Sequence, residues 1–448
     1  MHDAAPMLEQ LLDGVLADAG RSEALETERS LRTLCEPPAP GGFRDLDGVA
    51  GRLASLSAAE ILGVIEILTM RFHLRNKAEQ LTIASINRER EREATLEAPR
   101  AESIDDAIAA LSKRGVTPEA LRTTQDRIDV RPTLTAHPPE ARRRAVLRKQ
   151  ARLAELCKER DDPRLTPSEI DRAEDGLKRT LLGLATTDEV RSERLGPVDE
   201  IRNGLHFLTG SIWDAAPRLY DDLRRSVRTR FGQEMTDPPA MLRYRSWIGG
   251  DRDGNPRVTP EVTAEAFATH RREAARLYLI ELEALYQKLS VSTRRRPASD
   301  ALLAAIDAED PTPGLDERET RRLRFEPYRV RLLQLMHKVR RMAEGSGYTA
   351  AEFEADLEVI RCSLRDSGLS RVADSGAVWT LMLRVRTFGF HLAELDVRQH
   401  SAVHEKAVAE TLALAGVTDR YAEMDEAEKL DVLRRELSTP RPLTPDGA

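Results

Sequence analysis

The sequence predicts a mainly α-helical α/β protein, and three observations lead to this prediction. Most of the 448 residues follow the spacing of apolar residues that is typical of helices. Strand-like segments are few and short, and they lie at 133–136, 244–248 and 392–397. A polar cluster and then a helical pattern follow each of them, which is typical of parallel βα units. The long spacers between the segments leave room for large helical insertions.

The first long helical pattern covers residues 57–92. It begins at Ser57, and Glu60 three positions later completes a capping box. An apolar stripe at helical spacing follows, and it predicts a helix. The residues of this stripe are Ile61, Ile65, Leu68 and Phe72.

Two further helices have clear starts. Thr166 is followed by Pro167 and Glu169, which supplies a cap, a proline at the first helical position and an acid at the third. Thr259 and Pro260 start a helix that is expected to run to about residue 289. Other helical patterns cover 197–231, 325–343, 350–366 and 401–415. Loops are expected at 36–42, 293–297 and 308–316, and the proline-containing residues 438–448 resemble a tail or a linker.

The composition excludes several classes of protein. The 69 basic and 76 acidic side chains give a formal net charge of −7, which argues against a dedicated nucleic-acid binder. Hydrophobic residues make up 40% of the chain, enough for a core, and no apolar stretch approaches the ~18 residues of a membrane span. The N-terminal residues carry acids where a secretory signal would be basic, so we expect a cytoplasmic protein.

Cysteine and lysine are both scarce. Cys35, Cys157 and Cys362 are far apart and have no CxxC spacing, which argues against a disulfide framework and a zinc ribbon. Only nine of the 69 basic residues are lysine. Base-composition bias in the source genome is the simplest reason. The consequence is local, because the arginine guanidinium is the better fork for phosphate and carboxylate.

A histidine follows the first strand-like segment. His137 precedes two prolines, and three arginines come at 142–144. The carboxyl end of a strand is where α/β folds place reactive groups, and an imidazole can take or give a proton near neutral pH. The arginines would hold anions near that imidazole. The alternative is a histidine that fills a tight turn, beside arginines on a solvated helix face.

A dense group of charges follows the second segment. Trp247 leads into a loop with paired glycines and the three charged residues Asp251, Arg252 and Asp253. Paired glycines let a backbone approach a ligand closely. Three charges in three positions would order an oxyanion, a metal or another loop. The alternative is a solvated turn with an internal Asp–Arg pair.

The third segment ends in an acid and an arginine. Alternation along a strand places Asp396 and Arg398 on the same face. An arginine at the end of a strand that points into a pocket can bind phosphate through two parallel N–H groups. The alternative is a buried structural Asp–Arg pair. A fourth polar cluster, at 187–191 and 196–200, is explained by helix ends and caps. The sequence contains no HExxH, no P-loop and no GxGxxG after a strand.

Together these segments resemble the N-terminal half of phosphoenolpyruvate carboxylase, and the resemblance covers essentially all 448 residues. LTAHPPEARRR at 134–144 is similar to the family signature TAHPT-E-x-x-R-R, and RSWIGGDRDGNPRVT at 245–259 is nearly identical to its GGDRDGNP segment. TDEVRSERLGPVDEIRNG, EPYRVRLL and FGFHLAELDVRQHS match further blocks in the family's order, and NKAEQ at 76–80 fits an N-terminal helical block.

The resemblance implies an activity and roles for particular residues. The reaction joins phosphoenolpyruvate and bicarbonate to give oxaloacetate and phosphate, with Mg²⁺ or Mn²⁺, and supplies the tricarboxylic acid cycle. The implied roles are catalysis by His137, binding of substrate phosphate by Arg398 and Arg252, a loop beside the site with Trp247, Asp251 and Asp253, and a possible effector site for a sugar phosphate at Arg143 and Arg144.

The resemblance also implies a fold and partners. The family fold is a helix-decorated (β/α)8 TIM-type barrel. We therefore expect an N-terminal helical region at 1–130 and, at 131–448, the first three barrel strands with large helical insertions. The family's acidic metal ligands, its catalytic lysine and further arginines belong to the C-terminal half, so no metal ligand is expected in this chain. The implied partners are the two substrates, a separate chain with the C-terminal half and a homotetramer, without nucleic acid or membrane.

Two residues depart from the family pattern. Pro139 stands where the family has threonine, which removes a hydroxyl and a backbone N–H next to His137. His400 stands where the family has glutamate, beside Arg398. We expect this chain alone to lack carboxylase activity. The alternative is a non-catalytic truncated homologue that acts as a binding or regulatory protein or is a remnant. An unclosed barrel would also expose a strand edge and apolar inner faces, which predicts poor solubility or association.

Overall fold

The computed structural model describes residues 4–35, 46–135, 143–188, 196–235, 237–253, 255–309 and 312–444. The chain divides into two compact units. The first consists of residues 1–110 and 139–194, and the second of residues 111–138 and 195–448. Within the described ranges, no helix is both long enough and apolar enough to cross a membrane.

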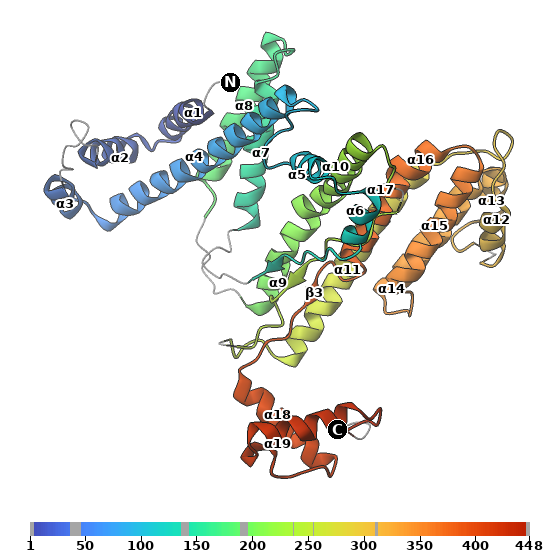
Figure 1. Cartoon of the computed structure of the whole chain (residues 1–448). Coiled ribbons are helices and arrows are strands. Elements are labelled where there is room, and N and C mark those ends of the chain that lie inside the picture. Colours follow the sequence, from blue (N-terminus) through green and yellow to red (C-terminus); the bar gives the residue numbers. More distant parts are fainter. Residues whose placement is uncertain are drawn as a thin grey trace. The chain divides into compact units, whose positions relative to one another are not determined.

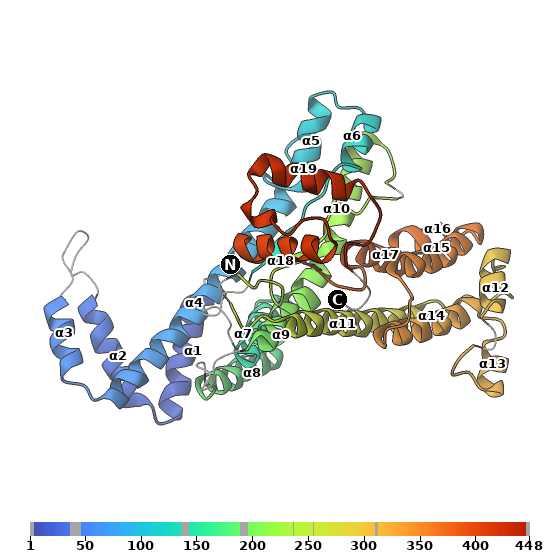
Figure 2. The same ribbon diagram turned by 90° about the horizontal axis from the view of Figure 1, so that it is seen from below.

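The first unit is a helical assembly around one apolar core. Helices α1 and α2 lie along the long helix α4, and α7 packs against α8 (Figures 1 and 2). Their shared core is formed mainly by leucines of α1, α4, α7 and α8. The bounds are α1 (Ala4–Asp18), α2 (Ser22–Cys35), α3 (Leu46–Ala54), α4 (Ala58–Glu93), α7 (Arg144–Arg160) and α8 (Pro167–Ala185), and α5 (Ile104–Lys113) crosses into the second unit.

Both helix starts predicted in this unit are confirmed. The Ser57 hydroxyl accepts from the backbone N–H of Glu60, and the Glu60 carboxylate accepts from the backbone N–H of Ser57 at 2.7 Å. Thr166 and Glu169 form the second capping box ahead of α8. Such a box satisfies backbone donors that a helix start leaves without partners.

The buried face of α4 is not the predicted apolar stripe. Ile65 and Phe72 of that stripe are 52% and 60% exposed. The stripe located the helix correctly, but Ile65 and Phe72 lie on an exposed side of α4, and another side packs against α1 and α2. The buried residues of α4 are Val64, Ile67, Met70, Arg71, Leu74 and Ala78.

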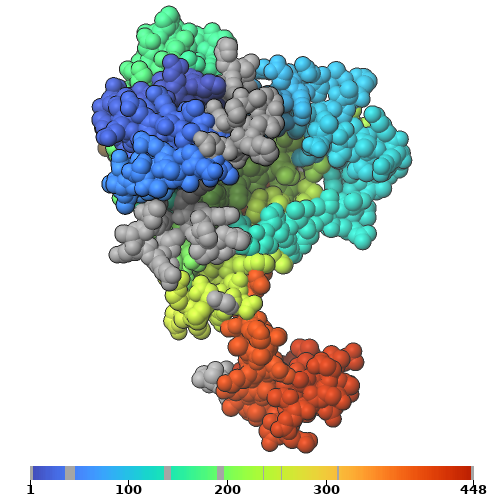
Figure 3. Space-filling model, turned by 90° about the vertical axis from the view of Figure 1, so that its left-hand side faces the viewer, coloured from blue at the N-terminus to red at the C-terminus, as the bar shows by residue number. Residues whose placement is uncertain are grey.

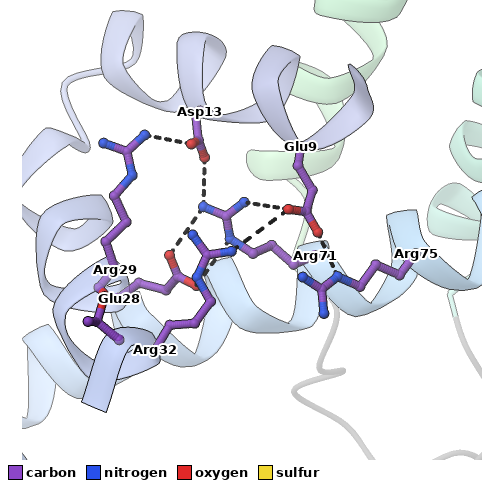
Figure 4. Close-up of polar contacts among 8 residues, drawn as sticks. Glu9, Asp13, Glu28, Arg29, Arg32, Arg71 and Arg75 are labelled. Atoms are coloured by element: carbon purple, nitrogen blue, oxygen red, sulfur yellow. Dashed lines mark hydrogen bonds and ion pairs between the residues drawn. The ribbon is translucent and has the colours of Figure 1, made fainter. Parts of the chain in front are cut away.

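A buried arginine of α4 pairs with acidic residues of α1 and α2 (Figure 4). The side chain of Arg71 on α4 is 4% exposed. Its Nε lies 3.1 Å from Oε1 of Glu28 on α2, and its Nη2 lies 2.6 Å from Oδ1 of Asp13 on α1. Burial acts to lower the pKa of Arg71, but the charges of Glu28 and Asp13 hold it above its ordinary value. Partly exposed arginines of α2 and α4 also pair with Asp13 and with Glu9.

The second unit contains most of the helices and the sheet. The predicted helices at 259–289, 325–343, 350–366 and 401–415 are confirmed, and the pattern at 197–231 forms two helices joined by a π-helical turn at Gly210. The bounds are α6 (Pro118–Gln125), β1 (Thr133–Leu134), α9 (Pro197–Phe207), η2 (Leu208–Ile212), α10 (Trp213–Phe231), β2 (Arg245–Ser246), α11 (Pro260–Lys288), α12 (Asp300–Asp307), α13 (Glu317–Leu323), α14 (Pro327–Ala343), α15 (Ala350–Asp366), α16 (Ser370–Ser375), α17 (Ala377–Phe388), β3 (Glu394–Leu395), α18 (Ser401–Leu414), η3 (Tyr421–Glu423) and α19 (Glu426–Leu437).

The last of these helices have a small core of their own. Leu412 of α18, Tyr421 of η3 and Val432 of α19 are buried together. In the space-filling view this segment, in orange-red, forms a compact body (Figure 3).

The three strands form one parallel sheet in the order β1-β2-β3. Thr133 pairs with Arg245, which pairs with Glu394 on its other side. The predicted parallel arrangement is therefore confirmed, although each strand has two residues and is shorter than predicted. Single parallel bridges extend the pairing, from residue 130 to 242 and from Asp251 to Arg398.

The two faces of the sheet differ. Alternate residues, among them Tyr244 and Ile248, pack on a core that contains Trp213, Tyr278 and Phe388. The other face carries paired charges, because the period-2 alternation of the strands turns every second side chain away from the core and these positions hold acids and arginines. The apolar inner faces expected of an unclosed barrel stay a prediction. The charged residues are Asp129, Arg131, Arg243, Arg245, Glu394 and Asp396.

A buried histidine gives the second unit a predicted pH dependence. His270 of α11 is buried, and its Nδ1–H donates to the carbonyl oxygen of His391 at 2.8 Å. Burial lowers the pKa of His270, which this hydrogen bond opposes in part. The unfolded chain therefore binds more protons than the folded chain. The stability is fully present above the unfolded pKa of about 6.5 and is lost as the pH falls below it.

Tryptophan fluorescence can measure this effect, because all three tryptophans lie in the second unit. We expect the midpoint of urea unfolding to fall between pH 7.5 and pH 5.5. His270→Asn, which keeps a donor near the Nδ1 position, should unfold earlier at pH 7.5 but with a weaker dependence on pH. An equal pH dependence in the variant would show that another group is responsible.

Candidate functional site

The ends of β2 and β3 meet through backbone contacts. The N–H of Arg398 donates to the carbonyl of Gly250 at 3.0 Å, and the N–H of Arg252 donates to the carbonyl of Arg398 at 2.9 Å. A Cβ at Gly250 would overlap the carbonyl oxygen of Asp396, and Gly249 has a φ of +89°. The paired glycines thus allow the two strand ends to approach each other, and the charged loop orders another segment of the chain.

The Arg398 guanidinium lies on an aromatic ring. Its Cζ is 3.9 Å from the centroid of Trp247, and its Nη1 is 3.3 Å from Oδ2 of Asp251. A guanidinium over an indole face is an attractive arrangement. The side chain is 39% exposed. Within the part of the chain that the structure describes, Asp251 is its one acceptor, and it contacts Nη1 and not the Nε–Nη2 edge of the fork.

Asp396 contacts the same ring from the neighbouring strand. The Nε1–H of Trp247 donates to Oδ2 of Asp396 at 3.2 Å, and Nη1 of Arg245 lies 4.0 Å from Oδ1 of Asp396. Asp396 and Arg398 both contact Trp247, which agrees with their predicted position on one face. The predicted alternatives, an Asp396–Arg398 pair and a pair internal to 251–253, are replaced by pairing between Asp251 and Arg398.

The other two charged residues of the loop have different surroundings. The Nη2 of Arg252 donates to the hydroxyl of Thr263 on α11 at 3.2 Å, and that hydroxyl donates to the carbonyl of Gly249 at 2.9 Å. The backbone N–H of Asp253 donates to Oδ1 of Asp251 at 3.2 Å, while the residue itself is exposed. Arg252 therefore anchors the loop to α11, and its role in phosphate binding stays a prediction.

His137 and Pro139 lie outside the described residues. The chain that precedes them is described up to Thr135, one residue after β1. The backbone N–H of Trp247 donates to the carbonyl of Leu134 at 2.9 Å. The chain therefore enters the segment with His137 from a point beside Trp247, and the catalytic role of His137 stays a prediction.

Arg143 and Arg144 lie in the first unit, at the start of α7. The Nη1 of Arg143 donates to the carbonyl of Asp188 at 2.7 Å and lies 3.9 Å from its Oδ2. Lys149 of α7 donates to the hydroxyl of Thr187 at 2.6 Å. The structure thus brings the 143–149 segment next to the first residues of the fourth polar cluster. A role of these arginines in effector binding stays a prediction.

His400 has a structural role in this chain. It is the N-cap of α18, where its Nδ1 accepts from the backbone N–H of Ala402 at 3.3 Å. The side chain that replaces the family's glutamate therefore caps a helix two residues after Arg398.

The ranges that the structure describes contain no cluster of metal-binding side chains. Histidine, cysteine, aspartate and glutamate side chains nowhere gather in a group of three or more within these ranges.

The charged side of the sheet was missed by motif reasoning. The Nη1 of Arg131 lies 3.0 Å from Oε2 of Glu394, and the Nε of Arg245 lies 3.3 Å from the same oxygen. These ion pairs lie on the same side of the sheet as Asp396 and Arg398. Their signal was available in the sequence, because charged residues occupy every second position at 129–131, 243–245 and 394–398.

Gly250 offers a direct test of how the site is built. Gly250→Ala should lower the free energy of unfolding of the second unit by about 1–3 kcal/mol, because the methyl group meets backbone that cannot move freely. The matched control is Gly347→Ala, since a Cβ at Gly347 meets nothing within 4 Å. Urea unfolding followed by tryptophan fluorescence measures both, and equal midpoints would contradict the close approach of the two strand ends.

Comparison with known proteins places these residues in a family. The family profile described as phosphoenolpyruvate carboxylase matches residues 1–448. The chain is 40% identical to the phosphoenolpyruvate carboxylase of Rhodothermus marinus, over 99% of this chain and 48% of the relative. It is 34% identical to that of Roseiflexus castenholzii, over 98% of this chain and 48% of the relative. For Aromatoleum aromaticum the identity is 36%, over 98% and 49%.

The chain spans about half the length of the curated relatives it matches. The blocks that carry the resemblance and the strand ends that carry Trp247, Asp251 and Arg398 lie within the matched part. The chain belongs to the phosphoenolpyruvate carboxylase family.

Proposed function

We propose that this chain supplies the N-terminal half of a phosphoenolpyruvate carboxylase, which carboxylates phosphoenolpyruvate with bicarbonate to give oxaloacetate and phosphate. The observation that carries the proposal is the Arg398 fork, held between Trp247 and Asp251 at the carboxyl ends of two parallel strands. Family membership over the whole chain supports it. The partly exposed guanidinium suits a phosphoryl group, because its fork matches phosphate geometry.

The proposed chemistry proceeds in three steps. An oxygen of bicarbonate attacks the phosphorus, and the bond between phosphorus and the enol oxygen breaks, giving carboxyphosphate and the enolate of pyruvate. His137 takes the proton of carboxyphosphate, which then divides into CO₂ and phosphate. The enolate carbon attacks CO₂ and forms oxaloacetate. Arg398 serves in the first step, where it binds the phosphoryl oxygens and holds their charge.

Several parts of the proposal concern the half of the relatives' length that this chain does not cover. We propose that β1, β2 and β3 are the first three strands of a (β/α)8 barrel, which their parallel order and consecutive pairing support. The ligands of Mg²⁺ or Mn²⁺, which would hold negative charge on the substrates, are assigned to the C-terminal half. We further propose a cytoplasmic tetramer in which Arg143 and Arg144 bind an activating sugar phosphate.

The test is complementation. The purified chain is mixed with the separately expressed C-terminal half of the Rhodothermus marinus relative, in phosphoenolpyruvate, bicarbonate and Mg²⁺. Oxaloacetate is measured by coupled reduction to malate, and released phosphate is measured in parallel. We expect no activity from either half and equal amounts of both products from the mixture.

Two outcomes would contradict this proposal. Oxaloacetate formation by the chain alone would show that it holds a complete site. If the halves associate, as measured by sedimentation, but remain inactive, the non-catalytic alternative is favoured. Exchanging Pro139 for threonine then shows whether the departure next to His137 accounts for the inactivity.

A further inference from the structure

We infer that Asp396 is a positioning residue of the candidate site, which orients the Trp247 ring on which the Arg398 guanidinium lies. This inference rests on the proposed binding of phosphate by Arg398. It assigns a role to a carboxylate that does not itself contact the anion.

Backbone pairing holds Asp396 in place. Its N–H donates to the carbonyl of Ser246 at 2.9 Å, immediately after β3. Its side chain then lies beside the residue that follows Ser246, which is Trp247. The indole Nε1–H can only donate, and Oδ2 of Asp396 accepts from it at 3.2 Å. A hydrogen bond at one edge of the indole restricts rotation of the whole ring.

The restricted ring sets the position of the arginine. Cζ of Arg398 lies 3.9 Å from the Trp247 centroid, and Asp251 contacts Nη1 at 3.3 Å. The Trp247 ring therefore covers one face of the guanidinium, and Asp251 occupies its Nη1. These two contacts fix the orientation of the Nε–Nη2 edge. Because the Arg398 side chain is already held in this position, an anion that binds the edge immobilises less side-chain motion than it would at a free arginine. The smaller entropy cost favours affinity.

Among the described residues, Asp396 contacts Trp247 and Arg245, whereas the Arg398 guanidinium pairs with Asp251. Asp396 and Arg398 are two positions apart on one strand face, within reach of a direct ion pair. The indole N–H occupies Oδ2 of Asp396, and Arg245 lies 4.0 Å from Oδ1. Asp396 therefore has its own partners, and within the described ranges it forms no ion pair with Arg398.

The test combines two substitutions with titration by inorganic phosphate, followed by isothermal calorimetry on the full chain. Asp396→Leu should weaken phosphate binding about three- to tenfold, while Asp396→Asn, whose amide oxygen still accepts, should stay within about twofold. In a Trp247→Phe background, Asp396→Leu should have no further effect, because its partner N–H is gone. Asp129→Leu removes a carboxylate from the same sheet face and serves as the matched control, with unchanged affinity.

Acrylamide quenching of tryptophan fluorescence gives a second readout that does not depend on phosphate. Trp213 and Trp379 are buried, so quenching reports on Trp247. Asp396→Leu should increase quenching. Equal quenching, or an equal loss of affinity in the Trp247→Phe background, would overturn the role of Asp396. If the unmodified chain binds no phosphate, binding of phosphate by Arg398 in this chain is contradicted, and the quenching result still decides whether Asp396 orients the ring.

Discussion

Arg71→Met is expected to lower the free energy of unfolding of the first unit by about 3–5 kcal/mol. The substitution removes the hydrogen-bonded cation of the wholly buried Glu28 carboxylate and leaves it only the partly exposed Arg32, at 3.7 Å. A buried charge that loses its hydrogen-bonded partner is costly, because water does not replace that partner. Asp13 and Glu9 lose less, since they are partly exposed and also pair with Arg29 and Arg75.

Two probes separate the units in this experiment. The three tryptophans report on the second unit, and circular dichroism reports on helices of both. Arg71→Met should move part of the circular dichroism transition to lower urea and leave the fluorescence transition in place. The double variant Arg71→Met with Glu28→Leu should recover much of the loss, because an apolar pair can replace a buried ion pair.

Arg75→Met is the matched control. It lies one turn further along α4 and pairs with Glu9 at 2.6 Å, but its side chain is half exposed. Such a pair contributes less than about 1 kcal/mol. If Arg71→Met and Arg75→Met have equal effects, the buried pair with Glu28 does not hold α1 and α2 on α4.

Arg398→Gln is expected to reduce kcat/KM of the complemented enzyme by roughly 10- to 150-fold, the range of one lost charge-assisted hydrogen bond. The glutamine keeps a polar side chain near Trp247 but loses the charge and the fork. Oxaloacetate formation in the mixture of the two halves measures the effect. Because the substitution also frees Asp251 from its cation, urea unfolding followed by fluorescence shows whether the second unit stays folded.

Arg243→Gln provides the matched control for this experiment. Arg243 lies on the same charged side of the sheet, before β2, and pairs with Asp129 at 2.9 Å. Its loss should leave kcat/KM unchanged. Equal losses in both variants would mean that the general charge of this sheet face, and not the fork at the strand ends, supports the reaction.

Much of the helical part of this fold could be predicted, because its signals are local. Ser57 with Glu60 and Thr166 with Glu169 form the expected capping boxes, since the cap and its partner are three residues apart in the chain. The parallel order of the strands also followed from short strands that feed helices. The lengths of the strands could not be predicted, because the hydrogen-bonded pairing with the neighbouring strands decides where each strand ends.

The site could be predicted only as a set of residues. Trp247, Asp251 and Arg398 were named from separate motifs, and the alternative considered for each motif was an acid–arginine pair within it. The observed pair joins Asp251 to Arg398, 147 positions apart. Motif spacing cannot show such a contact, because it depends on how closely the two strand ends approach at Gly250.

Sequence patterns were enough to locate the starts of several helices, among them α4 and α8, to predict parallel strands and to identify the family. Each of these depends on residues that are neighbours in the chain or on matched blocks. The tertiary structure alone decided that α4 buries the face with Arg71 instead of the face with Phe72, and that Arg398 pairs across strands. The physical reason is that the burial of a face and the pairing of charges depend on which segments pack together.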